Sequence, residues 1–242
     1  MATVRTHLRT ILQQGALELE GQFVLGSNYT FLVKVHYHEQ EYRAVYKPLQ
    51  GEQPLWDFPE NTLALREVAA YLVSEALGWR FVPCTILRED GPFGPGSLQQ
   101  YIEHDPNYHY FHFTDEDRGR LKAVMLFDLL CNNADRKGSH LLIEKGTRKL
   151  WLIDHGLCFH EEDKLRTVIW DFAGQDIPRD LLADVERFRA RLSSDPGLRA
   201  DLEPYLSPQE LAALAARATT LIHSGVFPFP PRDRRAFPYP PL

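Results

Sequence analysis

The chain has 242 residues, of which 44% are hydrophobic and 25% are charged, a composition typical of a globular protein. This length fits one domain of two lobes, or two small domains that share an interface. The formal net charge of −6 argues against nucleic-acid binding, which usually needs a basic surface. Because the N-terminal residues lack the apolar core of a signal peptide and no apolar run approaches about 20 residues, we expect a cytoplasmic protein that does not insert into membranes.

The cysteines and two strand histidines do not have the spacing of a metal site. Cys84, Cys131 and Cys158 are widely separated and form no CxxC pair, so we expect buried thiols and neither a disulfide framework nor a zinc knuckle. His36 and His38 are two residues apart on an expected strand, which places them on one face. No cysteine or carboxylate supports them at a suitable spacing, and an exposed strand face is the simpler interpretation.

Alternating apolar residues predict that the first part of the chain is rich in β-strands. After a short opening helix at residues 8–12, the alternation over 17–25 and 31–37 predicts two strands joined by a turn at 26–28. A third strand at 42–47 is ended by the proline that follows it.

A helix and two further strands are expected next. The apolar period predicts a helix that Asn61 or Thr62 caps and that runs to Leu77. Residues 81–87 and 97–103 have the pattern of strands.

The rest of the chain is predicted to be mainly helical. Helices are expected at 115–130, 179–192 and 208–223, with a hairpin of short strands at 140–143 and 150–153. The separation of a β-rich part from a helical part predicts an α+β fold. We divide the chain into an N-lobe at 1–103, a C-lobe at 104–226 and a tail at 227–242. The tail is rich in proline and aromatic residues, so we expect it to be extended, either draped over the body or loose, and able to dock on a protein partner.

Two charged residues of the first part suit the binding of a polyphosphate. Lys47 ends the third expected strand and supplies a compact positive charge, and Glu67, near the start of the next helix, could pair with it. The turn at Gly26, Ser27 and Asn28 can offer backbone N–H groups to phosphate. Each feature alone has a simpler interpretation, since a glycine turn is usually only a turn and a lysine at a strand end is usually solvated.

The segments around Asp135 and Asp154 are more informative. Asp135 lies in a polar loop after the 115–130 helix, and Asp154 follows the second strand of the hairpin. Such a hairpin can bring two carboxylates to one cleft, where one orients or deprotonates a nucleophile and the other binds Mg²⁺, a hard ion. The simpler alternative is a surface pair between Asp135 and Arg136, with Asp154 capping a turn before Gly156. The two segments together, behind the lysine and glutamate of the first part, favour the shared cleft.

Two loops resemble those of phosphatidylinositol 3- and 4-kinases. Residues 135–140, with the sequence DRKGSH, resemble the catalytic loop DRHxxN, and residues 153–156, IDHG, resemble the metal-binding IDFG. The triplet YKP at 46–48 also resembles the nucleotide-binding strand of HipA-type toxin kinases, a related branch. More narrowly, the chain is similar to a bacterial group described as phosphatidylinositol 3/4-kinase-like, over about residues 21–172.

This resemblance implies a two-lobed protein-kinase-like fold, of the phosphatidylinositol 3/4-kinase-like type, with ATP and Mg²⁺ or alternatively Mn²⁺ between the lobes. It implies that Asp135, Arg136 and Lys137 are the catalytic residues, with Asp135 as the catalytic aspartate, and that Asp154 and His140 are the metal ligands. The ATP-binding residues that it implies are Gly26, Ser27, Asn28, Lys47, Glu67 and, in the hinge that meets the adenine edge, Gln100, Tyr101 and Ile102.

Three positions depart from the family pattern. His140 stands where the family has a metal-binding asparagine, and an imidazole suits softer ions than Mg²⁺. His155 replaces a phenylalanine, and Lys137 replaces a histidine. An altered second metal site follows, and with it slow catalysis or none, although Lys137 could compensate by contacting a phosphate. A metal hydrolase site of His140, Asp154 and His155 is a more distant alternative.

These features favour an ATP-dependent phosphotransferase, because phosphoryl transfer mainly requires positioning and charge neutralisation. We expect the acceptor to be a protein serine or threonine, or a small molecule. A lipid is less suitable, since the chain has no basic amphipathic helix and a negative net charge. A nucleotide-binding pseudokinase, and a nucleotidyl transferase that moves AMP from the same cleft, are the alternatives. Asp171 either accepts hydrogen bonds that hold the catalytic loop or caps a turn.

Overall fold

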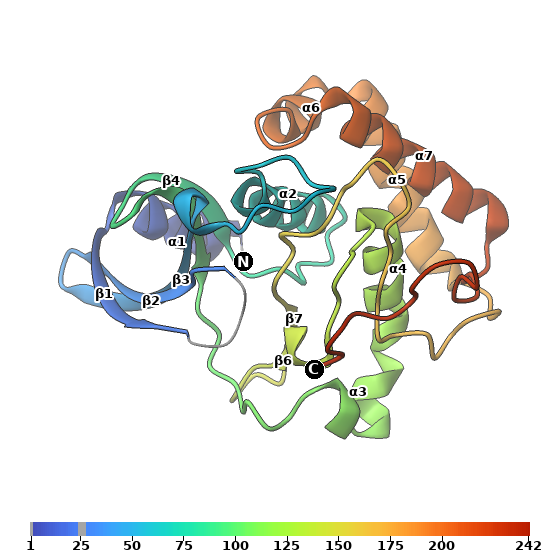
Figure 1. The fold of residues 1–242 in the computed structure, drawn as a ribbon, viewed down its shortest axis with the longest axis horizontal. Helices are drawn as coiled ribbons and strands as arrows, with labels where there is room; N and C mark the ends of the chain where they lie inside the picture. The colour runs from blue at the N-terminus through green and yellow to red at the C-terminus, as the bar shows by residue number, and fades with distance from the viewer. Residues whose placement is uncertain (1, 24–27) are drawn as a thin grey trace.

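The computed structural model describes residues 2–23 and 28–242, and its fold has two lobes (Figure 1). The helices are α1 (Ala2–Gln14), α2 (Leu63–Ala76), α3 (Asp115–Gly119), α4 (Leu121–Cys131), α5 (Arg179–Ser194), α6 (Pro196–Leu202) and α7 (Pro208–Ser224). The strands are β1 (Ala16–Gln22), β2 (Phe31–Tyr37), β3 (Gln40–Pro48), β4 (Thr85–Gly91), β5 (Gly94–Gln100), β6 (Leu141–Ile143) and β7 (Leu150–Leu152). Strands β1 to β5 with α1 and α2 form the first lobe, and the remaining elements form the second. The fold is therefore α+β, as the sequence predicts.

The first lobe is built on a curved antiparallel sheet with the strand order β1-β2-β3-β5-β4 (Figure 1). Val33 and Val35 of β2 and Tyr46 of β3 are fully buried beneath it. Because successive side chains of a strand alternate between the two faces, Lys47 lies on the face opposite to Tyr46. At Gly96 the two central strands approach so closely that a Cβ atom would lie 2.5 Å from the carbonyl oxygen of Lys47. The pairing of β3 with β5 thus fixes the position of Lys47 near the C-terminal end of β3.

The second lobe has α4 at its centre. The apolar side chains of α4 are almost all buried. Helix α7 packs on α4, and α5 packs on α7, on the side of α4 that faces away from the sheet (Figure 1). The helix expected at 115–130 is interrupted at Arg120, so that α3 and α4 are separate. A short helix, α6, forms between the two expected at 179–192 and 208–223, where Asp195 caps its N-terminus.

One expected strand begins later than predicted. Residues 81–84 are not part of a strand, and β4 begins only at Thr85. The amides of Phe81 and Val82 donate instead to the side-chain oxygen of Ser74 on α2, at 2.8 and 3.3 Å. Likewise, β5 ends at Gln100, before the segment that joins the lobes. The local apolar pattern predicts strands here, but a tertiary contact and the change of lobe end them.

The tail at 227–242 crosses the second lobe and ends beside the hairpin of β6 and β7 (Figure 1). The carbonyl oxygen of Ala236 accepts hydrogen bonds from the Thr167 amide and the Trp170 indole, both at 3.1 Å. The carbonyl oxygen of Pro241 accepts from the amide of Gly138 at 2.8 Å. The tail therefore lies on the body, the first of the two expected arrangements.

The three cysteines are buried, as predicted. In the part of the chain that the structure describes, no helix is both long enough and apolar enough to cross a membrane.

Candidate active site

A cavity of about 390 Å³ opens between the lobes and gathers most of the predicted site. The predicted residues that line it are Asn28, Lys47, Glu67, Gln100, Tyr101, Ile102, Asp135, Lys137 and Asp154. Two predicted residues, Arg136 and His140, do not line it. Gly26 and Ser27 lie outside the described residues. The volume lies within the range of small-molecule and cofactor sites.

Lys47 joins the two lobes across this cavity. Its ammonium group forms an ion pair with Glu67 of α2 and a second, at 3.0 Å, with the Oδ1 atom of Asp154. Burial by itself would lower the pKa of Lys47, but the two carboxylates outweigh it and raise the pKa above its usual value. Desolvation of Asp154 is outweighed in the same way, chiefly by Lys47, and its pKa is held well below the usual range. Lys47 and Asp154 are therefore both charged at neutral pH.

Glu67 is held in place by both of its oxygens. Oε1 contacts Lys47, and Oε2 accepts a hydrogen bond from the amide of His155 at 3.0 Å. The sequence suggests that Thr62 caps the helix that carries Glu67, but the side chain of Thr62 forms no capping hydrogen bond. The carboxylate of Glu52 accepts instead from the amides of Leu63 and Ala64, at 3.1 and 2.7 Å. This cap was missed because Glu52 lies eleven residues before the helix, in a loop whose path the sequence does not reveal.

The hinge residues begin at Gln100, the last residue of β5, and continue beyond the strand. The amide of Tyr101 donates to the carbonyl of Arg43 at 3.1 Å, and Ile102 accepts from His104. The amide of Ile102 has no backbone acceptor among the described residues. Ile102 also lines the cavity, as does Leu142, which belongs to the same hydrophobic cluster. This arrangement can present a backbone donor and apolar walls to a flat ring.

Two asparagines shape the loop that carries Asp135. Asn132 ends α4 in the left-handed conformation, with φ of 54°, and its side chain binds the carbonyls of His160 and Glu162. The side-chain oxygen of Asn133 accepts from the amide of Asp135 at 2.9 Å, a local turn that asparagine favours. The loop is thus fixed before Asp135 reaches the cavity.

Asp135 is the carboxylate in the cavity that can exchange a proton near neutral pH. Burial raises its pKa to about 6, and Lys137 acts in the opposite direction. The ammonium group of Lys137 lies 3.4 Å from its Oδ2 atom. Asp135 and Asp154 therefore differ in their chemistry, since one can accept a proton while the other remains a fixed negative charge.

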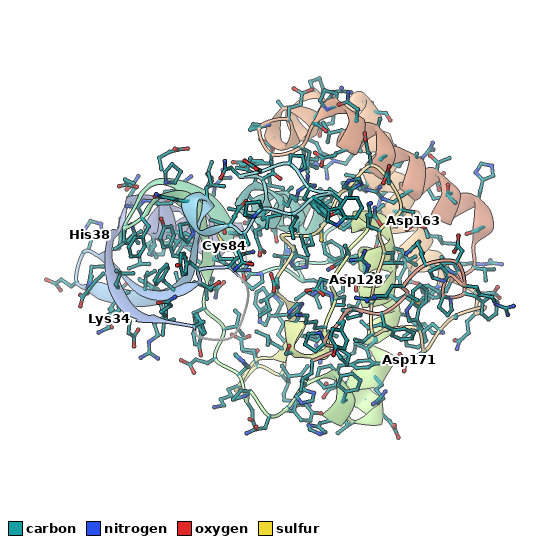
Figure 2. The ribbon with its side chains drawn as sticks, in the orientation of Figure 1. Lys34, His38, Cys84, Asp128, Asp163 and Asp171 are labelled. Atoms are coloured by element: carbon teal, nitrogen blue, oxygen red, sulfur yellow. The ribbon has the colours of Figure 1, made fainter. Side chains whose placement is uncertain are left out.

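Arg136 is buried beneath the cavity, where it holds the two functional loops together. It is fully buried, and its Nε atom lies 2.9 and 3.1 Å from the carboxylate oxygens of Asp128 (Figure 2). It also donates to the carbonyl of Ile153 and to the ring of His155, both at 2.8 Å. Arg136 therefore acts through other residues, as a positioning residue.

Asp128 has the role that the sequence suggests for Asp171. Its carboxylate accepts from Arg136, from the hydroxyl of Thr167 at 3.2 Å and from Asn133 at 3.3 Å. Asp171 accepts instead from Tyr110 at 2.6 Å, away from the catalytic loop (Figure 2). The missed signal is an aspartate inside an apolar helical run, because a buried carboxylate requires a partner.

Asp154 lies in a strained turn. Its φ of 60° falls in the left-handed region that residues other than glycine rarely adopt. Strain of this kind tends to gather at functional sites, where surrounding contacts maintain it. Here the amide of Ile153, just before it, donates to the carbonyl of His140 at 3.0 Å, and the amide just after it binds Glu67.

The overall fold resembles that of several kinases. The Golgi casein kinase solved with Mn/ADP bound has a TM-score of 0.60 and 13% identity, over 92% of this chain and 75% of its own. A hydra Fam20 structure solved with sugar gives 0.54 and 12%, over 88% and 87%. The Helicobacter pylori proinflammatory kinase CtkA gives 0.52 and 10%, over 89% and 94%. The chain has a two-lobed kinase-like fold.

No family model matches this chain, but a sequence relative covers almost all of it. Protein Rv2133c of Mycobacterium tuberculosis is 37% identical over 273 aligned positions, which cover 98% of this chain and 96% of that protein. The chain belongs to the family of protein Rv2133c. The match runs nearly end to end in both proteins, so the Rv2133c family includes both lobes and not the cavity alone.

In this member of the Rv2133c family, Asp154 and His140 are the residues that could hold a metal ion. The Nε2 atom of His140 lies 3.2 Å from Oδ2 of Asp154, and burial lowers the pKa of His140 to about 4, so the ring is neutral, as a metal ligand must be. Among residues 2–23 and 28–242, no group of three or more His, Cys, Asp or Glu side chains could hold a metal. Two donors fit an ion whose other ligands are phosphate oxygens and water, which is how Mg²⁺ often binds with nucleotides.

The alternative hydrolase site of His140, Asp154 and His155 does not form. The ring of His155 is fully buried, and its Nε2 atom faces Arg136.

The two histidines of the expected strand do not share a face. His36 pairs with Glu18 at 2.8 Å on the outer face of the sheet. His38 lies in the turn after β2, with φ of 53°, so it does not continue the strand (Figure 2).

Proposed function

We propose that the chain is an ATP-dependent phosphotransferase that binds Mg-ATP between its lobes. The observation that carries this proposal is the contact of Lys47 with both Glu67 and Asp154 on the wall of a cavity that also contains Asp135. A compact cation, a fixed carboxylate and a second carboxylate of raised pKa are the groups that phosphoryl transfer requires. The Golgi casein kinase of similar fold was solved with Mn/ADP, which supports a nucleotide and a divalent ion in this cleft.

Each residue of the cavity then has a role. When bound, Mg-ATP would supply the γ-phosphoryl group and part of its charge neutralisation. Lys47 would bind phosphate oxygens, and Asp154 with His140 would hold the metal ion. Asp135 would orient the acceptor hydroxyl and take its proton. The hinge at residues 100–102 would bind the adenine ring, and the turn that includes Asn28 would cover the phosphates.

The sequence pattern favours a particular branch of the kinase-like fold and particular boundaries between the lobes and the tail. The IDHG segment at 153–156 supports the phosphatidylinositol 3/4-kinase-like branch of the kinase-like fold. We place the boundary between the lobes after residue 103 and the beginning of the tail at residue 227. An acceptor that is a protein or a small molecule remains our proposal in preference to a lipid.

A nucleotide-binding pseudokinase is the second candidate, and one observation favours it. Lys137 pairs with Asp135, so the carboxylate that should accept the proton is already occupied by a cation. His140 in place of an asparagine points the same way.

The test is ATP turnover with Mg²⁺ or Mn²⁺, together with thermal shifts on adding nucleotide. We expect turnover to be lost in Asp135→Ala and in Asp154→Ala, and in Lys47→Ala but not in Lys34→Ala, a matched strand lysine on β2 that pairs with Glu41 (Figure 2). A metal-dependent thermal shift without turnover would favour the pseudokinase. Labelled ATP separates transfer of the γ-phosphoryl group from transfer of AMP. No shift and no turnover with either metal would contradict the nucleotide site.

A further inference from the structure

Arg166 lies beside the catalytic loop without an ion-pair partner. Its amide donates to the carbonyl of Asn133 at 2.9 Å, and its carbonyl accepts from the amide of Arg136 at 3.0 Å. These bonds place Arg166 opposite Asp135 in the neighbouring segment. Its side chain is half-buried, and among the described residues its guanidinium forms no hydrogen bond and no ion pair.

The neighbouring basic residues differ from Arg166 in this respect. Lys164 pairs with Asp57 at 3.5 Å and Glu162 at 2.9 Å, and Arg234 of the tail pairs with Asp163 at 2.5 Å (Figure 2). A half-buried arginine whose guanidinium has no hydrogen-bond or ion-pair partner is costly, because part of its hydration is lost without full compensation. Arg166 is therefore available to an anion that comes from outside the chain.

A second cation lies close to the carboxylate of Asp135. Lys137 lines the cavity and lies 3.4 Å from Asp135. Burial raises the pKa of Asp135, while Lys137 and Arg166 both act to lower it. Two cations thus act on one carboxylate of the candidate site, Lys137 from the cavity wall and Arg166 from the neighbouring segment, although the chain as a whole has a net charge of −6.

The backbone around Arg166 has no free edge for an extended peptide. The carbonyl of Leu165 accepts from Arg234 at 2.7 Å, and the amide of Thr167 donates to the carbonyl of Ala236 at 3.1 Å. The amide of Val168 donates to the carbonyl of Arg136, also at 3.1 Å. Recognition of a peptide by strand addition requires free backbone groups, and here the tail and the catalytic loop use them. A compact acceptor fits this place better than a polypeptide.

We propose that the acceptor is a small hydroxyl compound that carries an anionic group, a phosphate or a carboxylate, and that Arg166 and Lys137 bind this group beside Asp135. The inference rests on the proposed phosphotransferase. A guanidinium suits both anions, since its planar fork can bind two oxygens at once. In the transfer, a bond forms between the acceptor oxygen and the γ-phosphorus, and the bond from that phosphorus to the bridging oxygen breaks. ADP leaves with the electron pair, and the hydroxyl proton passes to Asp135.

The first experiment measures anion binding without turnover. The protein is saturated with Mg²⁺ and a non-hydrolysable ATP analogue, and inorganic phosphate or acetate is then added. We expect phosphate at about ten times its Kd to raise the melting temperature by roughly 3 °C. The shift should disappear in Arg166→Gln, be partly kept in Arg166→Lys, and be unchanged in Arg179→Gln, an exposed arginine at the start of α5. An equal shift in wild type and Arg166→Gln would overturn the inference.

The second experiment compares acceptors that differ only in charge. ATP consumption and labelled product are measured with glycerol, glycerol 3-phosphate and glycerate, and with glucose, glucose 6-phosphate and gluconate. We expect the anionic compounds of each series to be preferred over the neutral one. Comparison of the phosphorylated with the carboxylated compound shows which anionic group is bound. Arg166→Gln should raise the KM for the preferred anionic acceptors about ten-fold or more. No preference for an anionic member in either series, or faster transfer to a seryl peptide, would overturn the inference.

The two experiments also separate this inference from the proposed function. The shift produced by the ATP analogue alone reports on the nucleotide site, and its absence would count against the phosphotransferase. The further shift produced by phosphate on the loaded protein reports only on Arg166 and its surroundings.

Discussion

The carboxylate of Asp128 on α4 accepts hydrogen bonds at 2.9 and 3.1 Å from Nε of Arg136, and both side chains are fully buried. Arg136 also binds the carbonyl of Ile153 and the ring of His155. The pair therefore connects the central helix with the loop of Asp135 and the loop of Asp154. Removal of one partner leaves a buried charge without compensation, which typically costs about 3–5 kcal/mol.

We predict that Asp128→Ala lowers the free energy of unfolding by about 3–5 kcal/mol, as measured by urea unfolding. The double variant Asp128→Leu with Arg136→Met removes both charges, and it should recover most of this stability. It should still lack turnover, because nothing then holds the carbonyl of Ile153. A single variant within about 1 kcal/mol of the wild type would contradict this account of the pair.

The residues that line the cavity are more predictable from sequence than those beneath it. Lys47 lies near the end of a strand, and Asp135 and Asp154 each follow a helix or strand whose pattern is clear. The resemblance of the two loops and of the YKP triplet to known kinases names these three residues. The partners of Asp128 lie 8 and 39 residues further along the chain. No local pattern reports contacts at such separations, so the sequence offers the exposed Asp171 as a candidate for this role, with a turn cap as the alternative.

The same reason explains the errors in the fold. The strand expected from residue 81 fails because Ser74 of the preceding helix takes the amides of Phe81 and Val82. The cap of α2 comes from Glu52, in a loop that has no period. Local alternation is therefore a sound guide to strands inside the sheet, such as β2 and β3. It is a poor guide where a tertiary contact replaces the ladder.

Turnover should depend on pH through Asp135. Because burial raises the pKa of Asp135 to about 6, the carboxylate gains the ability to accept a proton as the pH rises, and kcat/KM should rise through about pH 6. Lys137 stabilises the charged carboxylate, so Lys137→Met should move this limb to higher pH. Lys34→Met, on β2, serves as the matched control and should leave the profile in place. A limb that does not move in Lys137→Met would exclude Asp135 as its source.

His155 should be replaceable by an acceptor but not by an apolar residue. Its Nε2 atom faces the guanidinium of Arg136 at 2.8 Å, where an arginine can only donate, so the ring must accept. His155→Leu leaves that donor unsatisfied in a fully buried place and should cost about 1–3 kcal/mol in the free energy of unfolding. His155→Gln, with an amide oxygen, should lose less stability and keep more turnover. Equal losses in the two variants, by urea unfolding and ATP turnover, would show that the hydrogen bond is unimportant.

Gly138 connects the catalytic loop to the tail and to the aromatic loop before α3. A Cβ atom added there would lie 2.8 and 3.0 Å from two ring atoms of Phe111, closer than carbon atoms pack, and its amide binds the carbonyl of Pro241. Gly138→Ala should therefore displace either the ring or the loop of Asp135. We expect turnover to fall about ten-fold or more, since small displacements of positioned groups are costly to catalysis. The change in the free energy of unfolding should be about 1–3 kcal/mol.

The double variant Phe111→Ala with Gly138→Ala distinguishes the two causes. Phe111 is 45% exposed, so its removal creates space without opening the core. If the clash with the ring displaces the loop, the double variant should regain turnover that Gly138→Ala alone has lost. If turnover stays low in the double variant while Phe111→Ala alone is active, the cause is instead the altered backbone of residue 138 and its bond to the tail. Steady-state turnover of the four proteins, with urea unfolding of each, decides between these outcomes.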